Sequence, residues 1–410
     1  MPSLSSAWSV CSVFISDTLG FDADMAACSL LLVLFVAGCG LAAQPWAPNR
    51  WGHAPLDLTD RPIIGILSME LSPTIQKYCG AHDSYIAASY VKFVEGAGAQ
   101  VAPILIGQSP EYYKRMANSV NGLLLPGGAT LFVEENGIEN PLGYAAAGRQ
   151  LYAQAKAINA RGEYFPVLGI CLGMELLAFL DAKKDILSTC NSEEPLPLKF
   201  LPGCSKGGSR MFSRAPRRIV ATLESNNVTV NHHKKCLTRS EMQRSGLDRE
   251  WRTLTVSKDA AGHEFVSAFE HTSQPYYGVQ FHPEKNIYEW KRNKHYPHSA
   301  AAIAASRFFA DFLVSEARRN NHSFPASTER DELIYRHQPV DTKEKLMWEQ
   351  LYFFEKQTNL STSPIVSTTE NDSQHDFDVG MAWGESTSMN RKLVVRINTF
   401  GILNALQTQV

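Results

Sequence analysis

Residues 167–173 read Val-Leu-Gly-Ile-Cys-Leu-Gly, an apolar strand that runs directly into a Gly-x-Cys-x-Gly turn. A helical stretch, Met-Glu-Leu-Leu-Ala-Phe-Leu, follows at residues 174–180. Strand, tight turn and helix in this order are typical of a nucleophile elbow, in which the turn lifts one side chain clear of the sheet. Glycines flank the turn because larger side chains would crowd the strained bend. The stretch therefore predicts an α/β fold with Cys171 as a thiol nucleophile.

The backbone around this turn is expected to stabilise negative charge. N–H groups at the start of a helix favour a thiolate and can hold an oxyanion, so the N–H of Leu172 is one candidate donor. Pro126-Gly127-Gly128 follows another apolar strand at residues 122–125. We expect Gly127 and Gly128 to supply the second donor, although an ordinary strand-exit turn explains the two glycines equally well.

A thiol nucleophile needs a base, and histidine is the usual one because its pKa lies near neutrality. The strongest candidate is His282, in Tyr277-Gly-Val-Gln-Phe-His-Pro-Glu284, at the carboxyl end of a predicted strand. Open α/β sheets place their reactive groups at such ends. Glu284 is positioned to accept a hydrogen bond from the imidazole and to fix its tautomer.

The rest of the chain alternates strands with helices. We expect strands at residues 61–67, 101–106, 122–125, 165–170, 251–256, 264–269 and 277–281, and helices at 84–95, 144–160 and 300–318. Residues 190–220 are rich in Pro, Gly and Ser and predict a long surface excursion. The alternation predicts a mainly parallel sheet with helices on both faces.

Charge and the N-terminal segment limit the class of protein. Lys and Arg number 39 against 41 acidic residues, so no global field favours nucleic acid or a charged membrane. The apolar run 28–43 predicts a signal peptide within residues 1–42, with Met25 as the probable start and Gly40 and Ala42 before the cleavage site. A linker at 43–59 would follow. An N-terminal membrane anchor is the alternative.

Removal of the signal peptide would leave five cysteines, Cys79, Cys171, Cys190, Cys204 and Cys236. One reactive thiol and two disulfides account for this odd number, and the sequence leaves the pairing open. Glycosylation sequons begin at Asn227, Asn321, Asn359 and Asn371. No Cys/His cluster has the spacing of zinc ligands, so no metal and no other cofactor is expected.

Several motifs together resemble a known family. Gly169-Ile-Cys-Leu-Gly-Met-Glu175, the Pro-Gly-Gly loop and the His-Pro-Glu motif look like the class I glutamine amidotransferase fold. Arg61-Pro-Ile-Ile-Gly-Ile-Leu67, Tyr85-Ile-Ala-Ala-Ser-Tyr-Val-Lys92 and His282-Pro-Glu-Lys-Asn-Ile-Tyr-Glu-Trp290 resemble the γ-glutamyl hydrolases more closely. The resemblance covers residues 60–338, which we expect to form the catalytic domain, and is looser at 182–210. Residues 339–410 have no counterpart and are expected to be largely irregular, with a short strand or helix near 392–406.

The resemblance implies a flavodoxin-like three-layer sandwich in which Cys171 is the nucleophile, His282 the base and Glu284 its orienting partner. It also implies that Glu175 and His233 shape the substrate cleft, with His232 an alternative to His233. The implied substrates are folylpoly-γ-glutamates and antifolate polyglutamates, and the implied state is a secreted or lysosomal homodimer. A glutaminase domain and a catalytically silent binding protein on the same fold are the rival hypotheses.

Overall fold

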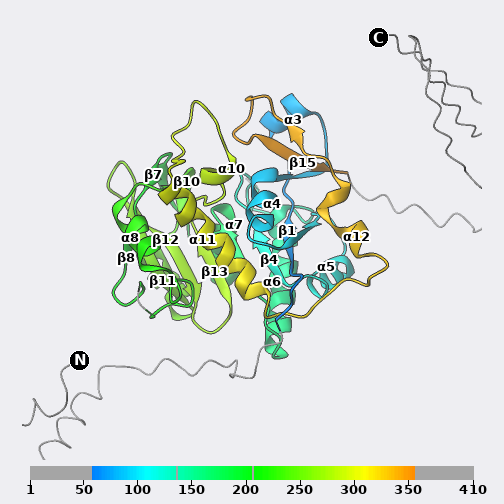
Figure 1. Ribbon diagram of the computed structural model, residues 1–410, viewed down its shortest axis with the longest axis horizontal. Coiled ribbons are helices and arrows are strands. Elements are labelled where there is room, and N and C mark those ends of the chain that lie inside the picture. Colours follow the sequence, from blue (N-terminus) through cyan, green and yellow to red (C-terminus); the bar gives the residue numbers. More distant parts are fainter. Residues whose placement is uncertain (1–57, 135–136, 206, 356–410) are drawn as a thin grey trace, which may run out of the picture. The chain divides into compact units, whose positions relative to one another are not determined.

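A mainly parallel sheet of eight strands forms the centre of the fold, as the sequence predicted (Figure 1). The computed structural model describes residues 58–134, 137–205 and 207–355. The strand order is β3-β1-β4-β5-β13-β12-β11-β8. These strands are β1 (Ile63–Leu67), β3 (Gln100–Ile104), β4 (Gly122–Leu125), β5 (Val167–Ile170), β8 (Lys199–Phe200), β11 (Trp251–Lys258), β12 (Glu264–His271) and β13 (Tyr276–Val279).

The sheet has a parallel part and an antiparallel part. Strands β3, β1, β4, β5 and β13 pair in parallel, whereas β12, β11 and β8 continue the sheet in antiparallel fashion. Every residue of β1, β4, β5 and β13 is buried, as strands covered on both faces require. The parallel part therefore brings the carboxyl ends of β5 and β13 side by side.

Helices cover both faces of the sheet. Helices α4, α10 and α11 contact one another on one face, and α5, α6 and α7 contact one another in sequence on the other. Their bounds are α4 (Ala88–Glu95), α10 (Lys285–Tyr288), α11 (Ala300–Ala317), α5 (Pro110–Ala117), α6 (Tyr144–Ala160) and α7 (Leu172–Ala182). The remaining helices are α3 (Pro73–Cys79), α8 (Arg217–Ser225), α9 (Arg239–Ser245), α12 (Glu329–Glu332) and the short 3-10 helices η2 (Leu247–Arg249) and η3 (Ile334–Arg336). Of these, α8 packs against α11 and η2 against α7.

The helix predicted at residues 84–95 is wrong in its first turn. Ser84–Ala87 form the strand β2, and only Ala88–Glu95 are helical. Strand β2 pairs with β15 (Gln350–Phe354), which lies more than 260 residues away in the chain, and β15 pairs in turn with β14 (Val340–Asp341). Such long-range pairing overrides the local helical pattern. It also makes residues 350–354 part of the fold, whereas the sequence predicted largely irregular structure from residue 339.

The predicted surface excursion at residues 190–220 is also more ordered than expected. It contains β8, β7 (Pro195–Leu196) and most of β6 (Ser188–Ser192). Strand β6 pairs with β10 (His233–Cys236), and β7 pairs with β9 (Thr229–Val230). Phe212 is buried and packs edge-on against Phe200 and Phe309. These aromatic contacts anchor a segment whose composition alone resembles a loop.

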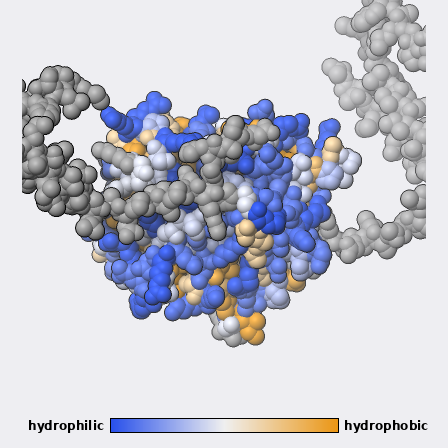
Figure 2. All heavy atoms as spheres, turned by 90° about the horizontal axis from the view of Figure 1, so that it is seen from below, coloured by the Kyte–Doolittle hydropathy of each residue, from blue (hydrophilic) through white to orange (hydrophobic). Residues whose placement is uncertain are grey.

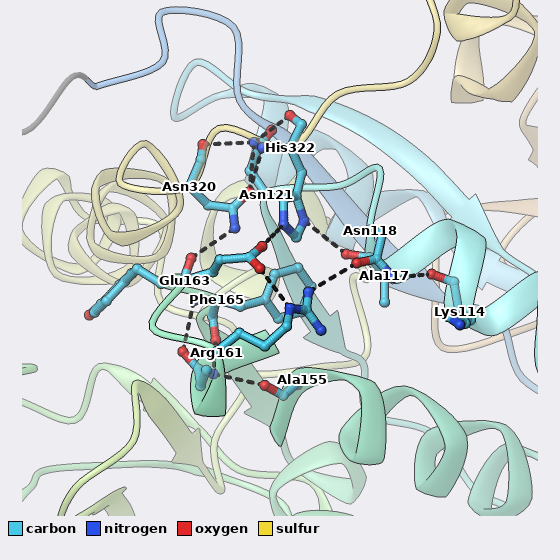
Figure 3. Close-up of polar contacts among 12 residues, drawn as sticks. Lys114, Ala117, Asn118, Asn121, Ala155, Arg161, Glu163, Phe165, Asn320 and His322 are labelled. Atoms are coloured by element: carbon cyan, nitrogen blue, oxygen red, sulfur yellow. Dashed lines mark hydrogen bonds and ion pairs between the residues drawn. The ribbon is translucent and has the colours of Figure 1, made fainter. Parts of the chain in front are cut away.

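A polar network fixes the amino ends of the parallel strands (Figure 3). The Asn121 side chain accepts from Ile63 N–H and donates to the carbonyls of Asn320 and His322. The Asn320 side chain donates to the carbonyl of Tyr164. The network thus joins the segment after α11 to the starts of β1, β4 and β5, and leaves their carboxyl ends open.

One disulfide, Cys190–Cys236, links β6 to β10, with the two Cα atoms 6.0 Å apart. Within the part of the chain that the structure describes, Cys79, Cys171 and Cys204 are free, so no second disulfide forms there. The predicted signal peptide, most of the linker at 43–59, the element near 392–406 and the sequons at Asn359 and Asn371 lie outside the described residues. Within the described ranges, no helix has the length and apolar character needed to cross a membrane.

Candidate active site

Cys171 occupies the sharp turn that the sequence predicted. It has φ 51° and ψ −111°, a conformation that residues other than glycine rarely adopt, and it directly precedes α7. A side chain at Gly173 would collide with the carbonyl of Leu125, and one at Gly169 would collide with the backbone of Gly173. The two glycines therefore allow α7 to start directly against β4, which turns Cys171 out of β5.

His282 stands next to this turn because β13 pairs with β5. Val279 pairs with Ile170, and the Cys171 N–H donates to the Val279 carbonyl at 2.8 Å. The chain then brings His282 over Gly127, and its Cε1 lies 2.8 Å from the point that a Cβ on Gly127 would occupy. Cys171 Cβ lies 3.0 Å from the same point. The imidazole and the thiol thus flank one glycine.

Glu284 orients the imidazole. Its Oε1 lies 2.7 Å from His282 Nδ1, and both side chains are buried. This contact leaves Nε2 as the nitrogen that can take a proton from the thiol. Burial lowers the pKa of His282, and this effect outweighs the opposing effect of Glu284. Burial raises the pKa of Glu284, but His282 and Lys285 together lower it by a larger amount. The pKa therefore lies below its usual value, and this carboxyl is ionised at neutral pH.

Tyr90, on α4, joins the base to the Pro-Gly-Gly loop. Its hydroxyl accepts from the Gly127 N–H at 2.9 Å and lies 3.2 Å from His282 Nδ1. The Gly127 N–H is thus already engaged, which differs from its expected use as an oxyanion donor. Gly128 lines the cleft beside Cys171 together with Leu172.

The start of α7 favours a thiolate at Cys171, as expected, but burial acts against it. Burial raises the pKa of Cys171 well above its usual value, and the carboxylates of Glu175 and Glu284 raise it further. The Leu172 N–H and the ammonium of Lys285 lower the pKa but do not outweigh burial. The thiol must therefore pass its proton to a neighbouring base as it reacts.

Glu175 lies on the first turn of α7, where the sequence placed it, and lines the cleft. Its Oε1 accepts from Gln280 Nε2 at 2.8 Å, and the same Nε2 lies 3.8 Å from Cys171 Sγ. Burial raises the pKa of Glu175 to about 7. Glu175 is thus a buried carboxyl that changes charge near neutral pH within reach of the thiol.

Both histidines of the Asn-His-His-Lys segment reach the site. His233 lines the cleft, with Nε2 3.1 Å from Asn231 Oδ1 and Nδ1 3.0 Å from the Lys235 carbonyl. Burial lowers the pKa of His233 to about 4 and that of His232 to about 3, so both are neutral at pH 7. The carbonyl of His232 lies 3.9 Å from Cys171 Sγ. The structure therefore brings both alternatives together at the cleft.

The cleft has a volume of about 390 Å³ and opens over Cys171. Its wall combines charged and apolar side chains. Lys234 and Lys235 are exposed on its rim, while Met347 and Trp348 come from the segment before β15. The cleft thus suits a ligand with both negative charge and apolar surface.

Two other clusters lie away from the cleft. A hollow of about 680 Å³ beside α8 and α11 carries five arginines, of which Arg307 and Arg319 pair with acidic neighbours. Asp181, Glu250 and His271 have side-chain atoms close enough for a metal ion. However, the Asp181 carboxylate already accepts from Tyr152, Trp251 and Lys156. The cleft over Cys171 is therefore the candidate active site.

Several residues of the site were not singled out from the sequence. They are Tyr90, Gln280, Lys285, Met347 and Trp348. Tyr90 and Lys285 lie inside motifs that carry the family resemblance, so these motifs could have identified them. Met347 and Trp348 lie beyond residue 338, in a segment whose composition gave no signal.

Comparisons with known proteins identify the family of this chain. Residues 62–284 match the Peptidase C26 family model. The γ-glutamyl hydrolase of Mus musculus is 36% identical over 80% of this chain and 98% of its own length. The γ-glutamyl hydrolase of Homo sapiens is 34% identical over 80% of this chain and 98% of its own length. γ-Glutamyl hydrolase 1 of Arabidopsis thaliana is 32% identical over 69% of this chain and 80% of its own length. The chain belongs to the γ-glutamyl hydrolase family, within the Peptidase C26 family of cysteine peptidases.

Proposed function

We propose that this protein hydrolyses γ-glutamyl bonds in folylpoly-γ-glutamates and in antifolate polyglutamates. One observation carries the proposal, namely that the buried His282–Glu284 pair and the Cys171 thiol flank Gly127 at the floor of an open cleft. The arrangement contains a nucleophile, a base and a residue that orients the base, as acyl transfer to sulfur requires.

The reaction follows from these positions. Cys171 gives its proton to Nε2 of His282 while Sγ attacks the γ-amide carbonyl, and the Leu172 N–H beside Sγ and the backbone at Gly128 stabilise the oxyanion. The imidazolium then protonates the leaving amine, which releases glutamate or oligoglutamate and leaves a thioester. Water, deprotonated by His282, attacks the thioester and restores the thiol.

Two lysines on the rim of the cleft, which is also lined by Glu175 and Glu193, support binding of a polyanionic substrate. Each residue of a poly-γ-glutamate chain carries a free α-carboxylate, and Lys234 and Lys235 lie on the rim where such groups would pass. Met347 and Trp348 offer an apolar wall for the pteroyl part. His233 and Glu175 also line the cleft and are proposed to shape it around the substrate.

The test separates hydrolysis from its rivals. The purified protein is incubated with pteroylpentaglutamate and, separately, with free glutamine, and the Cys171→Ala variant is treated in the same way. We expect shortened pteroylglutamates from the first substrate only, and none from the variant. Ammonia from glutamine without cleavage of the pteroyl substrate would identify a glutaminase. Tight pteroylpentaglutamate binding without turnover would identify a binding protein.

We also propose a homodimer. Three large hydrophobic side chains of one surface segment, Leu131, Ile138 and Leu142, are between 52% and 67% exposed. The other large hydrophobic side chains exposed among the described residues come from separate parts of the chain, namely Leu58, Tyr78, Trp290, Tyr335 and Val340. The face drawn in Figure 2 is mostly hydrophilic. Clustered exposed hydrophobic side chains are typical of contact surfaces. Sedimentation velocity is expected to give a dimer that Leu131→Glu weakens, and a monomeric wild type would contradict this.

We infer that the protein follows the secretory route to a lysosomal or extracellular location. The disulfide Cys190–Cys236 supports an oxidising compartment, and Asn227 and Asn321 begin sequons at exposed positions. The apolar run at 28–43 supports a cleaved signal peptide. N-terminal sequencing and glycosidase treatment of the secreted protein are expected to give a start near residue 43 and a loss of mass. An uncleaved, unglycosylated product would overturn the inference.

A further inference from the structure

Lys285 is a buried lysine that lies beside the His282–Glu284 pair and takes no part in the reaction proposed above. It follows Glu284 directly, begins α10, and is 0% exposed. Within the described ranges, its Nζ has no hydrogen-bond partner. Burial of an ammonium without hydrogen-bond partners lowers the stability of a folded protein, because the ion loses its hydration. Nearby negative charge must therefore offset this loss.

The surroundings of Nζ provide that compensation without direct contact. Nζ lies 5.7 Å from the ring centre of Tyr296 and 5.6 Å from that of Trp348, which is within range of cation–π attraction. Glu284 and Glu289 each have one buried carboxylate oxygen without a partner, on Oε2 and Oε1 respectively. The ammonium is therefore held by the field of these groups rather than by hydrogen bonds.

We propose that Lys285 is a positioning residue whose buried positive charge sets the protonation of the Cys171–His282 pair and keeps Glu284 a carboxylate. The proposal rests on the function proposed above for the same site. The charge acts through space, since Lys285 touches neither the substrate nor the reacting atoms. Trp348 packs on one side of this charge and lines the cleft on the other.

The electrostatics of the site support this role. Burial lowers the pKa of Lys285, but Tyr296, Glu284, Glu289 and Cys171 raise it, so that it lies above its usual value and Lys285 stays charged. Lys285 in turn lowers the pKa of Cys171, of His282 and of Glu284. The ionisable groups coupled to Lys285 are Cys171, His232, His282, Glu284, Glu289 and Tyr296.

The test replaces the ammonium by an uncharged side chain of similar length, Lys285→Met. Removing a positive charge raises the pKa of each neighbour that it had lowered. The pH profile of kcat/KM has an acid limb and an alkaline limb, which report the ionisable groups of the free enzyme. Both limbs should therefore move to higher pH by about one unit. A purely structural role would lower activity without moving both limbs in one direction. Lys285→Arg keeps the positive charge and should leave both limbs at their wild-type pH.

A second readout needs no substrate. Alkylation of Cys171 by iodoacetamide, followed on the peptide that contains it, measures the thiolate fraction. At pH 7 the Lys285→Met variant should react about tenfold more slowly. This readout separates the present proposal from the proposed function, because it is unaffected if folylpolyglutamates are not the substrate.

Lys291→Met is the matched control. Lys291 is also buried, but its Nζ lies 3.3 Å from Glu349 and 3.4 Å from Thr342, and it has no resolved effect on Cys171 or His282. This variant should lose stability and leave both limbs unmoved.

Lys285→Gln keeps the test open if Lys285→Met does not fold. The glutamine is also uncharged, and its amide can donate to the buried oxygens of Glu284 and Glu289 that lack a partner among the described residues. Both limbs should again move to higher pH. Unmoved limbs in whichever of the two variants folds would overturn the proposal.

Discussion

At the scale of single residues, Gly127 determines how closely the base approaches the nucleophile. A Cβ at this position would lie 2.8 Å from His282 Cε1, 2.8 Å from Tyr90 Oη and 3.0 Å from Cys171 Cβ. Real Cβ contacts are longer, so Gly127→Ala must push these groups apart. We expect kcat/KM to fall by about 100-fold or more, since displacements of about 1 Å in an active site have effects of this size. Steady-state kinetics against pteroylpentaglutamate measure it.

The control for this variant is Gly162→Ala. Gly162 has φ 90° and open space around its Cα, so alanine there costs backbone strain alone. Both variants should unfold at lower temperature, by amounts that correspond to about 1–3 kcal/mol. Only Gly127→Ala should lose activity, and comparable activity in the two variants would show that the site tolerates a wider separation.

Glu175 gives a prediction about pH and stability. Its pKa in the folded protein is about 7, because burial penalises the carboxylate, whereas the value for an exposed glutamate is 4.5. The folded state thus holds a proton that the unfolded state has lost between pH 4.5 and 7, and stability falls as pH rises through this window. Glu175→Gln removes the penalty and can still accept from Gln280.

The free energy of unfolding of Glu175→Gln should therefore equal that of the wild type near pH 4.5. It should exceed the wild-type value by about 3 kcal/mol above pH 7. Urea denaturation at pH 5, 6, 7 and 8 measures the difference. A difference that does not grow with pH would show that the carboxylate is solvated in the folded protein.

At the scale of elements, β15 is the strand least expected from the sequence. It covers the edge of β2, and Lys92 Nζ donates to Gln350 at 2.7 Å, which ties it to α4. The segment before β15 supplies Met347 and Trp348 to the cleft. Local composition at residues 340–354 shows no strand pattern strong enough to reveal a partner more than 260 residues away.

Leu351 tests whether β15 contributes to the core. Its side chain is 0% exposed, whereas Val340 on the neighbouring β14 is 46% exposed. Leu351→Ala should lower the free energy of unfolding by about 2–5 kcal/mol, and Val340→Ala by less than about 0.5 kcal/mol. Chemical denaturation of both variants checks this, and equal losses would mean that β15 is not packed as described.

At the scale of the whole molecule, the sequence predicted what depends on neighbours in the chain. The glycines around Cys171 and the apolar strands that end at Leu125 and Ile170 identified the sheet and the elbow. The Leu172 N–H lowers the pKa of Cys171, as the turn predicted, but burial, Glu175 and Glu284 raise it by more. These effects depend on residues packed around the thiol, which a linear pattern does not show. The engagement of the Gly127 N–H by Tyr90 was hidden for the same reason.

The charge of the molecule gives the last prediction. A formal net charge of −2 provides no long-range attraction for a polyanionic substrate, so attraction must come from the cleft rim, where Lys234 and Lys235 are exposed. Lys234→Gln/Lys235→Gln should raise KM for pteroylpentaglutamate by about tenfold, leave kcat unchanged, and flatten the dependence of kcat/KM on salt. The effect should be smaller for pteroyldiglutamate, which carries fewer carboxylates. Lys183→Gln/Lys184→Gln, at an exposed pair just after α7, is the matched control. Equal effects of the two double variants would mean that general surface charge, and not the rim of the cleft, attracts the substrate.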